Sequence, residues 1–138
     1  MKRVQQKSIE HADCGVACVA MVAGCSYQKA FAAFEFAKGQ CVFYTWHHHL
    51  ISALEKLGCT VKRKKFRTWG EIGGKAIVAV DHTKNGKWHW VAFDGETILD
   101  PKPKKVERKK DYRGKRGRGQ YLLVEVSQSD VGLKAIDK

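Results

Sequence analysis

Long apolar runs are missing from this chain of 138 residues, and so is any pairing pattern among its cysteines. No apolar stretch approaches the roughly 20 residues that a membrane-spanning helix needs, so we expect no membrane span. The basic N-terminal residues are followed by polar sequence and not by the apolar segment of a secretory signal. The expected location is therefore the cytoplasm.

The cysteines are five, an odd number, and no two of them form a CxxC pair. They therefore fit neither a disulfide framework nor a zinc ribbon. Most lie among alanines, valines and aromatic residues, where a free cysteine behaves as a small buried hydrophobe. That interpretation covers at least four of the five, which are Cys14, Cys18, Cys25, Cys41 and Cys59.

Acidic residues are also scarce, with 14 Asp and Glu against 26 Lys and Arg, which gives a net charge of +12. Of this excess, +8 lies in the stretch 102–118, where ten basic residues face only Glu107 and Asp111. A second, smaller basic run is Lys62-Arg63-Lys64-Lys65, with Arg67 just beyond it. The charge is therefore concentrated in two segments.

The segment 102–120, which contains the longer basic run, has no hydrophobic period and carries three glycines, which is typical of a loop between two strands. Basic residues interleaved with glycine suit phosphate contacts, and the alternative is a solvated charge run. No base-reading motif accompanies the charge. The residues that would contact a nucleic acid or an acidic partner are Lys104, Lys105, Arg108, Lys109, Lys110, Arg113, Lys115, Arg116 and Arg118.

The order of secondary structure predicts an α+β fold, because helical periodicity fills the first half and short apolar runs fill the second. We expect one domain over 1–126, with a basic loop at 102–120 inserted between strands and a C-terminal tail at 127–138. The predicted helices span 14–23, 27–37 and 46–57, with Asp13 and Ser26 as helix caps. The predicted strands span 59–66, 76–80, 88–93, 97–100 and 121–126.

The first chemical signal is Asp13-Cys14-Gly15 at a predicted helix start. A thiol there feels the positive end of the helix dipole and becomes a thiolate more readily. Cys14 is therefore the candidate nucleophile, and its main-chain N–H could face a developing oxyanion. Gly15 would let a substrate backbone come close. The alternative is a structural cysteine buried at the start of the helix.

The second signal is the segment from His89 to Asp100, with Asp94-Gly95 as a two-residue turn. That turn would put His89 directly opposite Asp100 on one face of a hairpin, where the carboxylate can orient the ring. The alternative is a chance histidine and an ordinary turn aspartate. His82 is the fallback base if the register differs.

A metal site is not expected at the adjacent histidines 47–49, because neighbours on a helix point about 100° apart. No other metal ligand set and no organic cofactor are expected. The four tryptophans are interpreted as core or cleft-wall residues.

The two blocks together resemble the C39 group of papain-like cysteine peptidases, whose best-known members remove leader peptides after a double-glycine motif. The resemblance implies a papain-like fold in which an N-terminal helical lobe packs on a mostly antiparallel sheet. It also implies Cys14 as nucleophile, His89 as general base and then acid, and Asp100 as the residue that holds His89. The glutamine that these peptidases place six residues before the cysteine is replaced here by Ser8. A two-residue insertion would restore that role to Gln6.

The function predicted from these residues is hydrolysis of a peptide or isopeptide bond in a peptide or protein substrate. Two alternatives stay open. The same three residues could serve a deamidase, an acyltransferase or a toxin-type enzyme. The site could instead be vestigial, with the basic loop binding nucleic acid.

Overall fold

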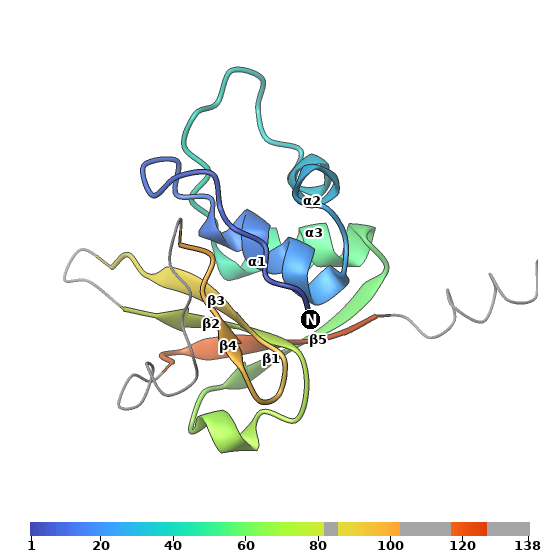
Figure 1. The fold of residues 1–138 in the computed structure, drawn as a ribbon, viewed down its shortest axis with the longest axis vertical. Helices are drawn as coiled ribbons and strands as arrows, with labels where there is room; N and C mark the ends of the chain where they lie inside the picture. Colours follow the sequence, from blue (N-terminus) through green and yellow to red (C-terminus); the bar gives the residue numbers. More distant parts are fainter. Residues whose placement is uncertain (82–85, 103–116, 127–138) are drawn as a thin grey trace, which may run out of the picture.

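The computed structural model describes residues 1–81, 86–102 and 117–126 of the chain. In these residues three helices pack over one face of a five-stranded sheet, which gives two layers (Figure 1). Every strand pairing is antiparallel, so the predicted α+β class is confirmed. The helices are α1 (Cys14–Ala23), α2 (Tyr27–Phe34) and α3 (His47–Lys56), with a short 3-10 helix η1 (Trp69–Glu71). The strands are β1 (Cys59–Lys65), β2 (Ala76–Val80), β3 (His89–Phe93), β4 (Ile98–Leu99) and β5 (Gln120–Val126).

The sheet has the strand order β1-β5-β2-β3-β4, so β5, the last of the described strands, lies between β1 and β2. The helices cover the face that carries Trp90, Leu122 and Val124, while Phe66, Val78 and their neighbours form a second core on the other face. Helix α1 packs against β3. This contact brings the start of α1 to the start of β3.

Helix α1 is the centre of the helical layer. Its residues from Cys14 to Val22 are all buried, and it contacts α2, α3 and the sheet. Its bounds match the prediction, and Gly24 ends it with φ 72°, a left-handed conformation that glycine adopts easily. Asp13 is the N-cap residue, as predicted, and its carbonyl accepts the N–H of Ala17, but its side chain makes no capping hydrogen bond and accepts from other donors instead.

Helix α2 ends at Phe34, three residues earlier than predicted. Glu35 takes a left-handed conformation with φ 54° and turns the chain out of the helix. The turn lets Phe36 stack on Phe34, with ring centroids 5.1 Å apart, and contact Phe43 at 4.8 Å. Aromatic packing therefore ends a helix that the alanine-rich sequence would have continued.

The hairpin of β3 and β4 is shifted by two residues from the predicted register. Phe93 pairs with Ile98, which leaves a four-residue loop in place of the predicted two-residue turn. Asp94 stabilises the longer loop, since its Oδ1 accepts the backbone N–H groups two and three residues further on, at 2.8 and 2.6 Å. His89 is therefore not directly opposite Asp100, but the even shift keeps both on one face.

No single helix in the described ranges is long and apolar enough to cross a membrane. Helices α1 and α2 meet the length and composition test only as a pair, and the pair is bent by 114°.

Candidate active site

Cys14 is the first residue of α1, and its side chain is buried beneath the start of β3. The backbone N–H of Trp90 donates to Cys14 Sγ over 3.5 Å. The next residue has to be glycine for a packing reason: a Cβ on Gly15 would overlap Thr45 Oγ1 and lie 3.2 Å from the Trp90 ring. The expectation that Gly15 admits a substrate backbone is therefore wrong, and its missing side chain lets helix and strand approach each other.

His89 opens β3 and hydrogen-bonds Asp100 through its Nε2 atom, 2.7 Å from Asp100 Oδ1. The two residues thus meet as predicted, although the register that brings them together is different. The Asp100 side chain is 1% exposed and also accepts the N–H of Lys102 at 2.9 Å. Cys14 and His89 line the same cleft, and Cys14 also raises the pKa of His89. The His89 ring is therefore influenced by the thiol as well as by the carboxylate.

The proton affinity of His89 follows from these contacts. Burial is the largest single effect and lowers the pKa of the imidazole, but the hydrogen bonds and charges of Asp100 and Cys14 raise it more. The result is a His89 pKa of about 9 against an ordinary value of 6.5. The ring consequently carries a proton at neutral pH, in a position to pass it to a leaving group.

The segment that follows Asp100 is held by the N-terminal residues. Arg3 donates from Nε to the Asp100 carbonyl at 2.8 Å and from Nη2 to the Lys102 carbonyl at 2.6 Å. The backbone N–H of Gln6 donates to the Pro101 carbonyl at 2.8 Å. Three hydrogen bonds thus hold the backbone of residues 100–102 against the first residues of the chain.

Gln6 is buried and lines the same cleft as Cys14 and His89. Between Gln6 and Cys14 the chain makes a turn in which Ala12, at φ 54°, donates its backbone N–H to the Ile9 carbonyl. The two-residue insertion itself stays a prediction.

The side chain of Gln6 is engaged inside the protein. Its Nε2 donates to the Ser8 carbonyl at 3.0 Å and to Asp13 Oδ1 at 3.1 Å. Its Oε1 is buried and has no hydrogen-bond partner among the described residues. Both amide hydrogens of Gln6 already have acceptors. Gln6 could therefore donate to an oxyanion only if one of these hydrogens left its present acceptor.

Asp13 is the residue whose role the sequence did not reveal. It is fully buried, and its carboxylate accepts from Gln6, from the Lys7 backbone at 2.6 Å and from the Tyr27 hydroxyl at 2.6 Å. Burial and the hydrogen bond to Asp13 raise the pKa of Tyr27 well above its usual value. The residue before the nucleophile thus anchors Gln6 through tertiary contacts that a local capping signal could not predict.

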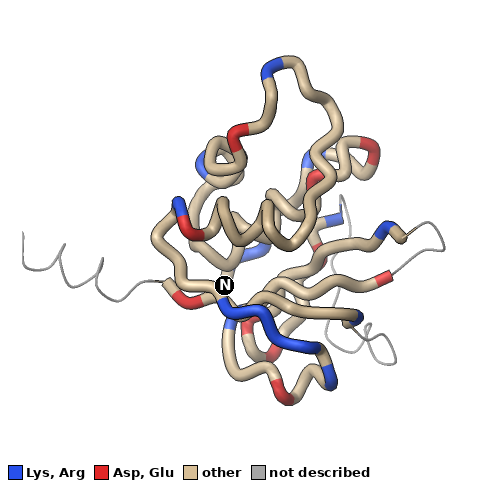
Figure 2. The backbone as a smooth tube through the Cα atoms, turned by 180° about the vertical axis from the view of Figure 1, so that it is seen from behind, with Lys and Arg blue, Asp and Glu red and all other residues tan. Residues whose placement is uncertain are grey.

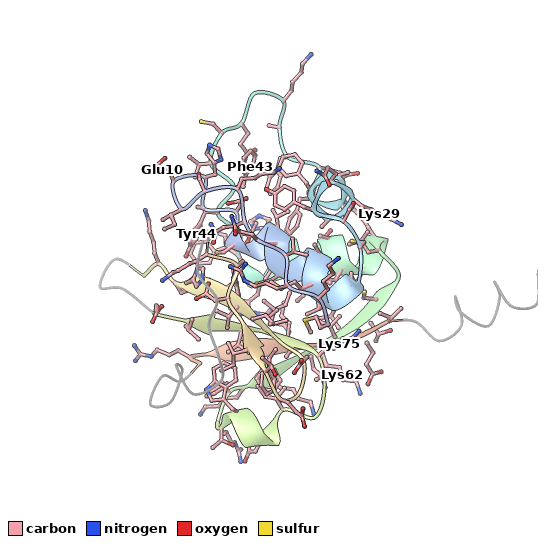
Figure 3. All side chains as sticks on the ribbon, in the orientation of Figure 1. Glu10, Lys29, Phe43, Tyr44, Lys62 and Lys75 are labelled. Carbon is pink, nitrogen blue, oxygen red and sulfur yellow. The ribbon has the colours of Figure 1, made fainter. Side chains whose placement is uncertain are left out.

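The cleft above these residues has a volume of about 640 Å³. Its wall is largely apolar, and its rim is charged. Ile9 and Val42 are 68% and 52% exposed, unusual values for aliphatic side chains beside an open cleft. Glu10 and Tyr44 lie on the same side of the molecule in Figure 3. The lining residues are Gln6, Ile9, Glu10, Ala12, Cys14, Val42, Tyr44, Asp81, Lys87, Trp88, His89 and Lys102.

The remaining predicted residues are placed as follows. His82 lies outside the described residues, as do all the expected nucleic-acid contacts of the basic loop except Arg118, which is exposed. Of the adjacent histidines, His47 hydrogen-bonds the Gln120 carbonyl and His49 accepts from the Trp46 backbone. No group of three or more potential metal ligands occurs within the described ranges.

Two comparisons with solved structures bear on the fold. The peptidase domain of Streptococcus ComA, a bifunctional ABC transporter involved in quorum sensing, is 23% identical with a TM-score of 0.67. The match covers 91% of this chain and 98% of that domain. A double-glycine-motif protease from an AMS/PCAT transporter, solved with its leader peptide, is 17% identical with a TM-score of 0.58. That match covers 91% of this chain and 93% of the other.

The chain has the papain-like fold of these peptidase domains. No family model matches its sequence, and neither does any curated protein. The likeness therefore concerns the arrangement of helices and strands, and it does not show which residues are catalytic.

Proposed function

We propose that this protein is a cysteine peptidase that cleaves a peptide or isopeptide bond. Cys14 is the nucleophile, His89 the general base and acid, and Asp100 the residue that orients His89. The observation that carries this proposal is the hydrogen bond of 2.7 Å between His89 Nε2 and Asp100 Oδ1, beside a cleft that both Cys14 and His89 line. Nucleophile, base and orienting group in hydrogen-bond contact are what nucleophilic catalysis by a thiol requires.

The first half of the reaction forms a thioester. The Cys14 thiolate attacks the carbonyl carbon, the C–N bond breaks, and the protonated His89 ring gives its proton to the departing amine. In the second half, water adds to the thioester while His89 takes its proton. The C–S bond then breaks and releases the acid together with the Cys14 thiolate. No other group is needed to balance these steps.

The oxyanion formed in each half needs hydrogen-bond donors. The first N–H groups of an α-helix have no acceptor within the helix, so the Cys14 N–H at the start of α1 is available. Gln6 is the proposed second donor. In this role its Nε2 gives up the hydrogen bond to the Ser8 carbonyl and donates to the oxyanion instead. Replacing Gln6 by Ala should then lower the rate by about 10²–10³, the usual cost of one such donor.

A peptide substrate fits the surroundings of the site. The apolar wall at Ile9 and Val42 and the charged rim can hold a chain segment along the cleft. One of the two similar structures contains a leader peptide, which supports a peptide as the substrate class. The five free cysteines of this chain support a reducing compartment, and we propose the cytoplasm.

The first test is alkylation by iodoacetamide between pH 6 and pH 10, with the label located by mass spectrometry. Cys14 should label faster than Cys41, even though Cys41 is exposed and Cys14 is buried. The advantage should disappear in His89→Ala. Peptide cleavage should be lost in Cys14→Ser and retained in Cys41→Ser, the matched control.

Equal labelling of Cys14 and Cys41 would remove the basis for an enzyme. Selective labelling without cleavage of a peptide library would instead assign the site to another amide or acyl group, as in a deamidase or an acyltransferase.

A further inference from the structure

Strand β1 carries four consecutive basic residues, Lys62-Arg63-Lys64-Lys65, and all four are exposed. The strand ends the sheet order, and within the described residues only β5 pairs with it. Figure 2 shows the four residues as one unbroken blue stretch of the tube. A line of positive charge therefore runs along one margin of the sheet.

Two arginines extend this line where β1 meets the entry of β5. The backbone N–H of Phe66 donates to the Gly119 carbonyl at 2.9 Å. Arg67 and Arg118 flank this hydrogen bond, and both are exposed. Segments about fifty positions apart in the sequence thus supply one surface. We name it the basic edge, and it consists of Lys62, Arg63, Lys64, Lys65, Arg67 and Arg118.

The charges of the basic edge are not neutralised by the described part of the protein. The ion pairs found there are Lys56–Glu35, His89–Asp100 and Lys102–Asp81, and none includes a residue of the basic edge. On the paired strand β5 the acidic residue is Glu125, opposite Thr60 at the far end of β1. Lysines on an edge strand also discourage sheet-to-sheet aggregation, but Arg67 and Arg118 lie beyond the strand and do not serve that purpose.

The chemistry of the basic edge selects the kind of partner. Successive side chains of a strand point to opposite faces, and alternate ones repeat about every 6.6–6.8 Å, so cations lie on both sides of the margin. Stable protein interfaces are built around buried apolar and aromatic anchors, and the run 62–65 offers none. A phosphate backbone needs only charge and is itself a line, whereas a membrane surface is a plane. We propose that the basic edge binds the phosphate backbone of a nucleic acid without reading its sequence.

This surface is separate from the candidate active site. None of its residues lines the cleft around Cys14. In Figure 3, Lys62 lies across the molecule from Glu10 and Tyr44. Binding at the basic edge would therefore leave the cleft open, and the inference does not depend on the proposed peptidase activity.

The test is fluorescence anisotropy of a labelled 20-base-pair DNA duplex of arbitrary sequence, titrated with the full chain at several salt concentrations. The variant Lys62→Gln/Lys64→Gln/Lys65→Gln removes three charges from the basic edge. The control Lys2→Gln/Lys29→Gln/Lys38→Gln removes three charges from exposed lysines elsewhere. Each lost phosphate contact reduces the magnitude of the negative slope of log K against log salt by about 0.9. The slope of the edge variant should therefore be less steep than that of the wild type by about 2.7. At 0.1 M salt its affinity should fall on the order of 10²-fold.

The control should keep most of the wild-type affinity, and an edge variant that carries arginine at the same three positions should bind as the wild type does. Equal losses in edge variant and control would overturn the proposal, because net charge alone would then explain binding. Unchanged affinity in the edge variant would overturn it as well, whichever other segment binds. The proposal would also be overturned if the protein bound phosphatidylserine vesicles or polyglutamate more tightly than the duplex and the edge variant lost that binding. Circular dichroism melting curves would verify that each variant is folded.

Discussion

Replacing Asp100 by Asn removes the charge that holds the proton on His89 while keeping the shape of the side chain. The pKa of His89 is raised from 6.5 to about 9, which corresponds to about 3 kcal/mol in favour of the imidazolium at 1.36 kcal/mol per pH unit. Burial acts in the opposite direction. With Asp100 neutralised, only Cys14 still opposes burial, and the pKa of His89 should fall well below 9. The imidazole proton signals in an NMR titration measure this directly.

The same substitution should change stability in a defined pH window. A folded-state pKa above the unfolded value stabilises the protein fully below about pH 6.5, and this contribution is lost as the pH rises through about 9. The free energy of unfolding of Asp100→Asn should therefore lie below that of the wild type by up to about 3 kcal/mol at pH 6, and by much less at pH 10. Peptide cleavage at pH 7.5 should fall in proportion to the lost imidazolium, by about tenfold if the His89 pKa returns to its ordinary 6.5.

Asp94→Asn is the matched control, since Asp94 lies in the loop of the same hairpin and away from His89. It should leave the His89 titration where it is. If Asp100→Asn kept the His89 pKa near 9, the carboxylate would not be the source of the raised proton affinity, and the orienting role assigned to Asp100 would be wrong.

Three further predictions concern packing and thiol chemistry. Gly15→Ala should lower the free energy of unfolding, measured in urea, by about 1–3 kcal/mol through overpacking. The control Gly70→Ala, at a position with no atom within 4 Å of the added Cβ, should change the free energy of unfolding little. Equal effects of the two substitutions would contradict the contact assigned to Gly15. Tyr27→Phe leaves the buried Asp13 short of one donor and should cost about 1–3 kcal/mol in the same assay. Cys18 should resist iodoacetamide in the folded protein up to pH 9, because burial and the charge of Cys14 raise its thiol pKa; labelling at the rate of the unfolded chain would refute that.

The parts of the fold that could be predicted from sequence are those set by local patterns. Helix α1 has both predicted ends, because an apolar run and a following glycine define it without tertiary information. Strand β2 also has its predicted bounds, since five consecutive apolar residues form a fully buried strand. Such signals lie within a few neighbouring residues.

The parts that could not be predicted depend on distant contacts. Helix α2 stops early so that Phe36 can reach Phe43, which no local periodicity records. The turn after β3 is longer because Asp94 bonds two backbone groups, an alternative that the Asp-Gly pair alone does not exclude. The contact between His89 and Asp100 was nevertheless predicted, because an even register shift preserves the face of a strand.

The residues of the candidate site could likewise be predicted only in part. The motif around Cys14 and the hairpin predicted Cys14, His89 and Asp100, and the structure places His89 beside Asp100 and in one cleft with Cys14. Gln6, predicted from the resemblance, lines the same cleft. Asp13 was interpreted as a helix cap, because that is the commonest use of an aspartate in this position. Its donors include Gln6, Lys7 and Tyr27, which lie six to fourteen positions away and are recognised as partners only in the three-dimensional structure.

The hydrogen bonds from Arg3 and Gln6 to the chain around Asp100 have a consequence for the order of events during folding. They join residues almost a hundred positions apart, and the contact of Trp90 with Cys14 spans 76. Contacts of such separation form late, after the entropy of closing long loops has been overcome. Cys14 is synthesised before His89 and Asp100, and it meets them only once the residues near 100 have docked. Under the proposed function, Cys14 therefore acquires its base only when the fold is complete.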